Sequence, residues 1–179
     1  ITHTLSDLYD ATNNLIQGGS EAQQSSAKTD LADNEGWYIE LQGEDSSGVL
    51  HDGEKVISGS ITFGGKVIFT SFTPDFTSSG TGCSLNLGIA RLYILDILDG
   101  SATSDLNNDG EIDGDDRSKE LAQTGLPAPA NIVHVQKTDA DGNAVEGQTK
   151  QVLCVATECD DDVLSDDGGL TKSYWREDH

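Results

Sequence analysis

A pair of strands around a tight turn is the clearest element that the hydrophobic pattern predicts. The runs EKVISGSITF (54–63) and KVIFTSFT (66–73) are rich in β-branched and aromatic residues, and Gly64 and Gly65 lie between them. Two such runs separated by two glycines are typical of a β-hairpin. Pro74 ends the second run, since proline has no N–H to donate to a neighbouring strand.

Further strands are predicted around this hairpin. The run ARLYILDIL (90–98) is almost wholly apolar, which indicates a strand buried on both faces inside a sheet and ending at Asp99 and Gly100. The other predicted strands are GWYIEL (36–41), NIVHVQKT (131–138), TKQVLCVAT (149–157) and LTKSYWRE (170–177), with an Asp141-Gly142 turn between the middle two.

The first 35 residues follow a different pattern. Leucine and isoleucine recur at near-helical spacing over residues 2–17, Thr4 and Asp7 form a capping-box pattern, and Gly18-Gly19 supplies a stop. The polar stretch 20–35 then predicts a flexible linker or surface loop. We therefore predict a mainly β fold with antiparallel sheets, divided into an N-terminal helix and linker (1–35) and a β-domain (36–179).

Charge narrows the range of partners. The chain holds 32 acidic and 10 basic residues, a net charge of −22. Such a surface repels phosphate backbones and anionic lipids, so we expect neither nucleic acid nor a membrane surface as partner. No apolar run is long enough to predict a membrane span. An acidic surface does attract divalent cations.

Three cysteines leave the disulfide pairing open. Cys154 and Cys159 can close a small loop in an oxidising compartment, or Cys83 can pair with one of them. A processed signal peptide would explain why the sequence starts at Ile1 without methionine, but so would a fragment boundary. We expect a secreted, extracellular protein.

One segment carries a metal-binding pattern. Residues 105–116 read DLNNDGEIDGDD. Oxygen ligands at loop positions 1, 3, 5, 7, 9 and 12, with glycine at position 6, are typical of an EF-hand calcium loop. Gly110 permits the sharp bend, Ile112 is expected to anchor the loop in the core, and RSKELAQT (117–124) is expected to form the exiting helix. The predicted ligands are Asp105, Asn107, Asp109, Glu111 through its backbone carbonyl, Asp113 and Asp116.

Calcium explains this segment better than the alternatives. Asp, Asn and Gly also favour solvated turns, which accounts for the residue types but not for their order. Magnesium prefers fewer protein oxygens and more water. At position 12, Asp116 has a shorter side chain than the usual Glu and reaches the ion less easily for bidentate ligation. The acidic stretch CDDDVLSDDGG (159–169) lacks loop spacing and is better read as a solvated turn.

With these residues in order, the chain resembles the C-terminal domain of the PilY/PilC family of type IV pilus tip adhesins. The matching pieces are GWYIEL, GEKVISGSITFGGKVIFTSFTP, Cys83, ARLYILDILDG, DLNNDGEID, GLPAP and SYWRE. The resemblance runs from Gly36 to the end and does not include residues 1–35. Family members are much longer than this chain.

The resemblance implies part of a modified β-propeller with a calcium loop that influences pilus extension and retraction, adhesion and twitching motility. It also implies pilus tip or minor pilin subunits as partners. A second hypothesis is a structural subunit that assembles with copies of itself into extracellular rings or filaments stabilised by calcium. Enzymatic activity of the quinone-dependent propeller type ranks last, because the sequence offers no catalytic constellation, and we expect no enzyme.

Overall fold

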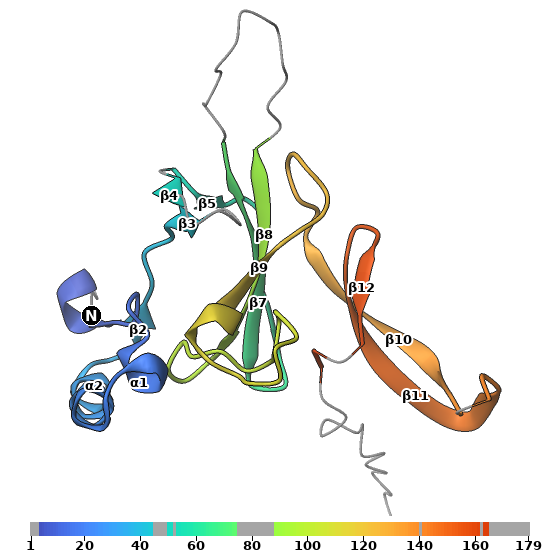
Figure 1. The fold of residues 1–179 in the computed structure, drawn as a ribbon, viewed down its shortest axis with the longest axis horizontal. Coiled ribbons are helices and arrows are strands. Elements are labelled where there is room, and N and C mark those ends of the chain that lie inside the picture. The colour runs from blue at the N-terminus through green and yellow to red at the C-terminus, as the bar shows by residue number, and fades with distance from the viewer. Residues whose placement is uncertain are drawn as a thin grey trace, which may run out of the picture.

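The computed structural model shows a mainly β protein with antiparallel sheets and few helices (Figure 1). It describes residues 4–44, 50–51, 53–74, 88–139, 141–161 and 163–164. Cys83 and the predicted strand at 170–177 lie outside these residues. The elements are η1 (Leu5–Asp7), β1 (Tyr9–Asp10), α1 (Leu15–Gly18), α2 (Glu21–Asp33), β2 (Trp37–Tyr38), β3 (Gly43–Glu44), β4 (Leu50–His51), β5 (Lys55–Val56), β6 (Ile61–Phe63), β7 (Lys66–Thr73), β8 (Ile89–Asp96), η2 (Gly114–Arg117), β9 (Ser118–Glu120), β10 (Ala130–Thr138), β11 (Ala144–Val155) and β12 (Glu158–Asp160).

The predicted hairpin around Gly64-Gly65 is confirmed as β6 and β7. Phe63 pairs with Lys66, and the two glycines adopt φ angles of 55° and 78°, which a two-residue turn of this kind requires. β7 ends one residue before Pro74, as predicted. The first predicted strand, 54–63, is interrupted and forms β5 and β6. Both pair with β7, in a sheet of order β5-β7-β8-β9 with β6 beside β7.

β8 occupies the interior of this sheet and is buried on both faces, as its apolar run predicts. Successive side chains of a strand point to opposite faces. Leu92 and Ile94 therefore join one hydrophobic cluster, and Tyr93 and Leu95 join another. The strand ends at Asp96, earlier than predicted, and Leu98 beyond it is 77% exposed.

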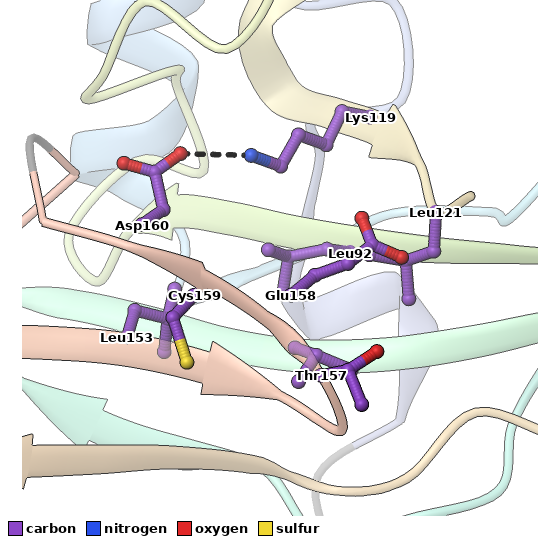
Figure 2. Close-up of a pocket in the computed structure, with 9 residues that line it drawn as sticks. Leu92, Lys119, Leu121, Leu153, Thr157, Glu158, Cys159 and Asp160 are labelled. Atoms are coloured by element: carbon purple, nitrogen blue, oxygen red, sulfur yellow. Dashed lines mark hydrogen bonds and ion pairs between the residues drawn. The ribbon is translucent and has the colours of Figure 1, made fainter. Parts of the chain in front are cut away.

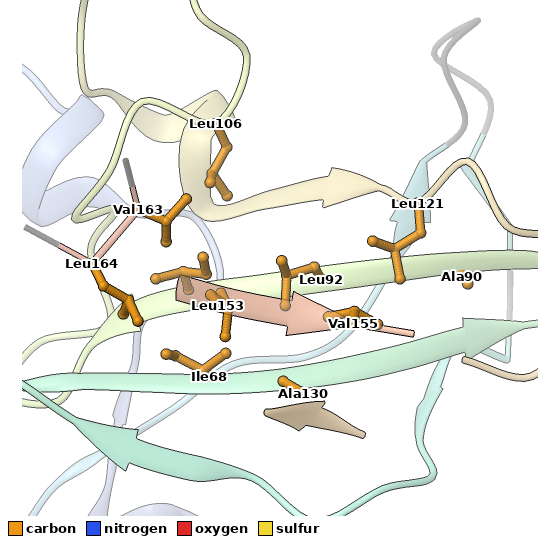
Figure 3. Packing of buried hydrophobic residues seen from close by; sticks show 11 residues of the cluster. Ile68, Ala90, Leu92, Leu106, Leu121, Ala130, Leu153, Val155, Val163 and Leu164 are labelled. Carbon is orange, nitrogen blue, oxygen red and sulfur yellow. The ribbon is translucent and has the colours of Figure 1, made fainter. Parts of the chain in front are cut away.

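The main core lies between this sheet and the sheet of order β10-β11-β12 (Figure 3). Leu92 and Ile94 pack there with Leu153 and Val155 of β11. The predicted pairing of β10 with β11 is confirmed. Cys154 and Cys159 face each other across β11 and β12 and form a disulfide, so one of the two predicted pairings is confirmed.

The N-terminal segment packs on the opposite face of the central sheet (Figure 1). Trp37 contributes to both the N-terminal cluster and the cluster around Tyr93 and Leu95. Its indole Nε1 donates a hydrogen bond to the carbonyl oxygen of Ile97 at 3.0 Å. Gly100 has a φ of 71°, and a Cβ there would lie 3.0 Å from the Trp37 ring. Glycine at that position allows the ring to approach.

The single helix predicted near the start is wrong. The capping interaction does form, because the Asp7 carboxylate accepts the backbone N–H of Thr4 at 2.7 Å, but it caps only the short 3-10 helix η1. β1 follows and pairs in parallel with β2, which recruits residues that the periodicity placed in the helix. Asn14, with a φ of 49°, also departs from helical geometry. Tertiary pairing overrides a weak local preference here.

The linker predicted at 20–35 is also wrong, because this stretch forms α2. Gln23 accepts the backbone N–H of Ser20 at 3.0 Å and completes a capping box. The helix buries little apolar surface, with Ala27 as its buried residue. A helix that lacks an apolar stripe leaves no periodic signal in the sequence. No helix in the described ranges combines the length and hydropathy needed to cross a membrane.

We predict that the interior of β8 controls stability. Ile94 is fully buried, so Ile94→Ala is expected to lower the free energy of unfolding by about 2–5 kcal/mol through lost packing and a residual cavity. Leu98→Ala is the matched control, with an expected change within about 0.5 kcal/mol because that side chain is exposed. Urea denaturation measures both, and equal effects of the two substitutions would contradict this description of the core.

Candidate metal centre

The acidic loop connects two neighbouring antiparallel strands. It leaves β8 after Asp96 and returns through η2 to β9, which pairs with β8. The preceding segment is a strand, as predicted, but the exiting helix predicted at 117–124 is wrong. Ser118–Glu120 form β9 instead, since pairing with β8 satisfies the backbone groups of both strands. The loop therefore has EF-hand-like residues between strands.

Asp105 organises the N-terminal half of the loop. Its Oδ1 accepts the N–H of Asn108 at 2.6 Å and its Oδ2 accepts the N–H of Gly110 at 2.9 Å. Asn108 and Gly110 both have positive φ angles, 62° and 93°. At Gly110 this angle, rather than lack of space, explains the glycine, since a Cβ there would meet nothing within 4 Å. These bonds curl the backbone around one carboxylate.

Asp116 holds the two ends of the loop together from a fully buried position. Its Oδ1 accepts the backbone N–H groups of Leu106 at 2.8 Å and Asn107 at 3.1 Å. Its Oδ2 accepts the N–H of Asp113 at 3.0 Å. Three such bonds offset part of the free energy that burial of a carboxylate costs.

The structure brings three of the predicted ligands together. Carboxylate oxygens of Asp105, Asp109 and Asp116 lie within 4.8 Å of one another. Calcium binds oxygens at about 2.3–2.6 Å, so two ligands of one ion lie at most about 5 Å apart. The spacing and the hard oxygen donors therefore fit a single calcium ion.

The remaining predicted ligands lie elsewhere in the loop. Asn107 donates from Nδ2 to Asp109 Oδ2 at 3.0 Å, so it adjoins the three carboxylates. The carboxylates of Glu111 and Asp113 do not belong to that group, and Asp113 accepts the N–H of Asp115 at 2.9 Å as the cap of η2. Ligation by the Glu111 carbonyl stays a prediction.

The core anchor of the loop is not the predicted one. Ile112 is 52% exposed, whereas Leu106 is 6% exposed and packs in the main core. Leu106 stands immediately after Asp105, and its backbone N–H is bound by Asp116. Insertion of this side chain draws the first ligand position toward the sheets, which leaves Ile112 on the outer side.

Residues far away in the sequence hold the loop in place. The Lys66 ammonium donates to Ser104 Oγ at 2.8 Å and to the Val163 carbonyl at 2.7 Å. Burial lowers the pKa of Lys66. The Arg117 guanidinium donates to the carbonyls of Ala11 and Thr12, both at 3.0 Å. Burial likewise lowers the pKa of Arg117, and the Asp99 charge partly opposes this.

Gln17 links the N-terminal segment to both ends of the loop. Its side chain donates to the Ile112 carbonyl at 3.1 Å and accepts the N–H of Ala102 at 3.0 Å. These contacts could not be predicted, because the residues that make them are ordinary polar residues and follow no local spacing rule. Gln17 and Arg117 thus couple the acidic loop to the segment that carries α1.

A cavity of about 340 Å³ lies apart from the acidic loop, between β9 and β12 (Figure 2). Its apolar wall is formed by Leu92, Leu121, Leu153 and Val155. At its rim Lys119 pairs with Asp160 at 2.9 Å. Glu158, also at the rim, accepts the backbone N–H of Gln123 at 3.2 Å. The charged groups around the cavity are therefore engaged with one another and with the backbone.

No family model, curated protein or solved structure matches this chain. Membership of the PilY/PilC family therefore stays a prediction from the sequence motifs.

We predict that Asp116 stabilises the protein even when calcium is removed. Asp116→Asn replaces one acceptor oxygen with an amide that cannot accept the Asp113 N–H, and loss of a hydrogen bond to a charged group costs about 1.5–3 kcal/mol. Relief of repulsion from Asp105 and Asp109 returns about 1 kcal/mol. The net expected destabilisation, measured by urea unfolding in chelator, is about 0.5–2 kcal/mol.

Asp115→Asn is the matched control for this measurement. Asp115 is exposed and its backbone N–H, which caps onto Asp113, remains. We expect a change within about 0.5 kcal/mol. Equal unfolding curves for the two variants would show that the buried carboxylate does not hold the loop.

Proposed function

We propose that this chain is a calcium-binding extracellular protein of the PilY type, acting in type IV pilus-associated adhesion, pilus biogenesis or motility. The observation that carries the calcium assignment is the approach of Asp105, Asp109 and Asp116 to within 4.8 Å. Bound calcium would supply two positive charges that offset the repulsion among these carboxylates.

The positions of these residues indicate how calcium binding would change the loop. Asp105 and Asp109 belong to the N-terminal half of the loop, and the buried Asp116 belongs to η2. Residues that share one ion are held at fixed separations. The two halves of the β8–β9 connection therefore resist being pulled apart. Through Arg117 and Gln17 the same restraint reaches the N-terminal segment.

Further observations support the compartment, the ion and the pilus role in turn. The Cys154–Cys159 disulfide is typical of proteins that mature in an oxidising compartment. The net charge of −22 attracts divalent cations, which supports the calcium assignment. The pilus assignment is supported by the order of the motifs, from GWYIEL through DLNNDGEID to SYWRE.

We predict that calcium raises the stability of the folded chain. At a free concentration one hundred times the dissociation constant, the expected gain is about 2.7 kcal/mol, which raises the melting temperature by roughly 5–10 °C. Asp109→Asn should abolish most of that gain, because it removes one charge from the group of three. Differential scanning calorimetry with calcium, with magnesium and with chelator measures the shift.

Asp115→Asn again serves as control, since it removes an acidic charge from the same loop outside the group of three. It should retain the calcium shift. A melting temperature that is insensitive to both calcium and chelator in the parent protein would refute the metal assignment.

The pilus assignment has a separate genetic test. We predict that deletion of the gene in its source cells reduces piliation or twitching motility, and that a D105A D109A allele reproduces part of the defect without loss of protein. Electron microscopy counts the pili. Normal pili and motility in the deletion strain would remove the pilus role and leave calcium binding untouched.

A further inference from the structure

We propose that the outer edge of β10 is the surface through which two copies of this chain pair, strand against strand. In the part of the chain that the structure describes, β10 is the end strand of its sheet and pairs with β11. Figure 1 shows the β10–β11 ribbon extending away from the central sheet. The backbone N–H and C=O groups along such an edge are a template for another strand.

From Ala130 to Gln136 this edge lacks the features that usually prevent pairing, although Lys137 follows at its outer end. Natural edge strands carry charges, prolines or bulges. Residues 121–136 contain no Asp, Glu, Lys or Arg, although charged residues make up 23% of the chain. The irregularity of β10 lies between Gln136 and Thr138, at its outer end, so most of the strand is regular.

The opposite edge of the same ribbon is protected. Along β11, Glu146 is exposed, Gly147 has a φ of 75°, and Lys150 forms an ion pair with Asp161. Charge and a distorted backbone discourage addition of a strand. The contrast between two edges of one ribbon favours β10 as the strand that is covered.

One face of β10 also carries apolar side chains that a neighbouring strand would cover. Val133 is 42% exposed, and Val135, two residues further, lies on the same face and is half-buried. Val133 pairs with Val152 of β11, so the apolar strip already extends across the ribbon. A third strand beside β10 would lengthen this strip.

A self-complementary register favours a second copy as the occupant. Two chains of net charge −22 repel each other over most of their surfaces. The neutral stretch 121–136 is a place where they can meet without opposing carboxylates. In an antiparallel pair centred on His134, the middle residue of β10, Val133 faces Val135 of the second copy and Lys137 faces Asn131 of the second copy. No like charges are opposed.

A strand paired with itself in this way is related by a two-fold axis, which closes the assembly as a dimer rather than a filament. A single strand pairing buries less than the roughly 1,200–2,000 Å² of stable complexes, so we expect a dimer that dissociates on dilution. This inference differs from the hypothesis of calcium-stabilised rings or filaments, because the pairing closes as a dimer and does not depend on calcium binding.

Sedimentation equilibrium over a range of protein concentrations tests the pairing. The mass should rise from 19.0 kDa toward twice that value, equally in calcium and in chelator. Val133→Asp and Val133→Lys should each raise the dissociation constant at least about tenfold, because each places like charges at diagonal positions across the two-fold axis and replaces an apolar contact with Val135 of the second copy. An equimolar mixture of the two variants should restore the pair.

Gln148→Asp is the matched control, since Gln148 is exposed on β11 and the same charge is added away from the β10 edge. It should pair like the parent. A parent that stays at 19.0 kDa at all concentrations overturns the inference, as does a Val133→Asp variant that pairs normally.

A crosslink keeps the test decisive if a Val133 variant fails to fold. In a Cys83→Ser background, oxidation of His134→Cys should give a disulfide-linked dimer, and Gln148→Cys should not. Equal crosslinking at both positions would overturn the β10 register. Loss of the calcium-dependent melting shift with an intact His134→Cys crosslink would refute the metal assignment alone.

Discussion

Burial of both faces of the β7–β8 pair is the constraint on which the rest of the structure depends. One face of this pair packs against β11 through Leu92, Ile94 and Leu153, and the other packs against Trp37 through Tyr93 and Leu95. A sheet that is covered on both sides needs two separate layers of partners. The N-terminal segment supplies one layer and the β10–β12 sheet supplies the other. The central sheet therefore requires both.

The strands that were predictable are those in which local pattern and burial agree. The hairpin at Gly64-Gly65 and the apolar run of β8 are specified by residues adjacent in sequence. Prediction failed where an element is defined by a distant partner. β1 forms by pairing with Trp37 and Tyr38 of β2, and β9 forms by pairing with the edge of β8. α2 was not predicted, because its capping residues rather than an apolar stripe define it.

In the acidic loop, too, features set by local pattern were predictable and features set by distant packing were not. The order of oxygen-bearing residues identified the segment, and Asp105, Asp109 and Asp116 do approach one another. The sequence could not reveal that Asp116 is buried beneath three backbone N–H groups, since this follows from Leu106 rather than Ile112 entering the core. Both side chains are aliphatic, and only the packing of the two sheets selects between them.

The contacts made by Gln17 and Arg117 also bear on the order in which the chain folds. Each joins positions separated by roughly a hundred residues, so the segment with α1 finds its final partners only after the ribosome has released residue 117. Until then α2 depends on the small cluster in which Ala27 packs with Ile16 and Trp37, since short isolated helices are marginal in water. During synthesis the N-terminal segment therefore completes its contacts only when the β8–β9 connection has emerged.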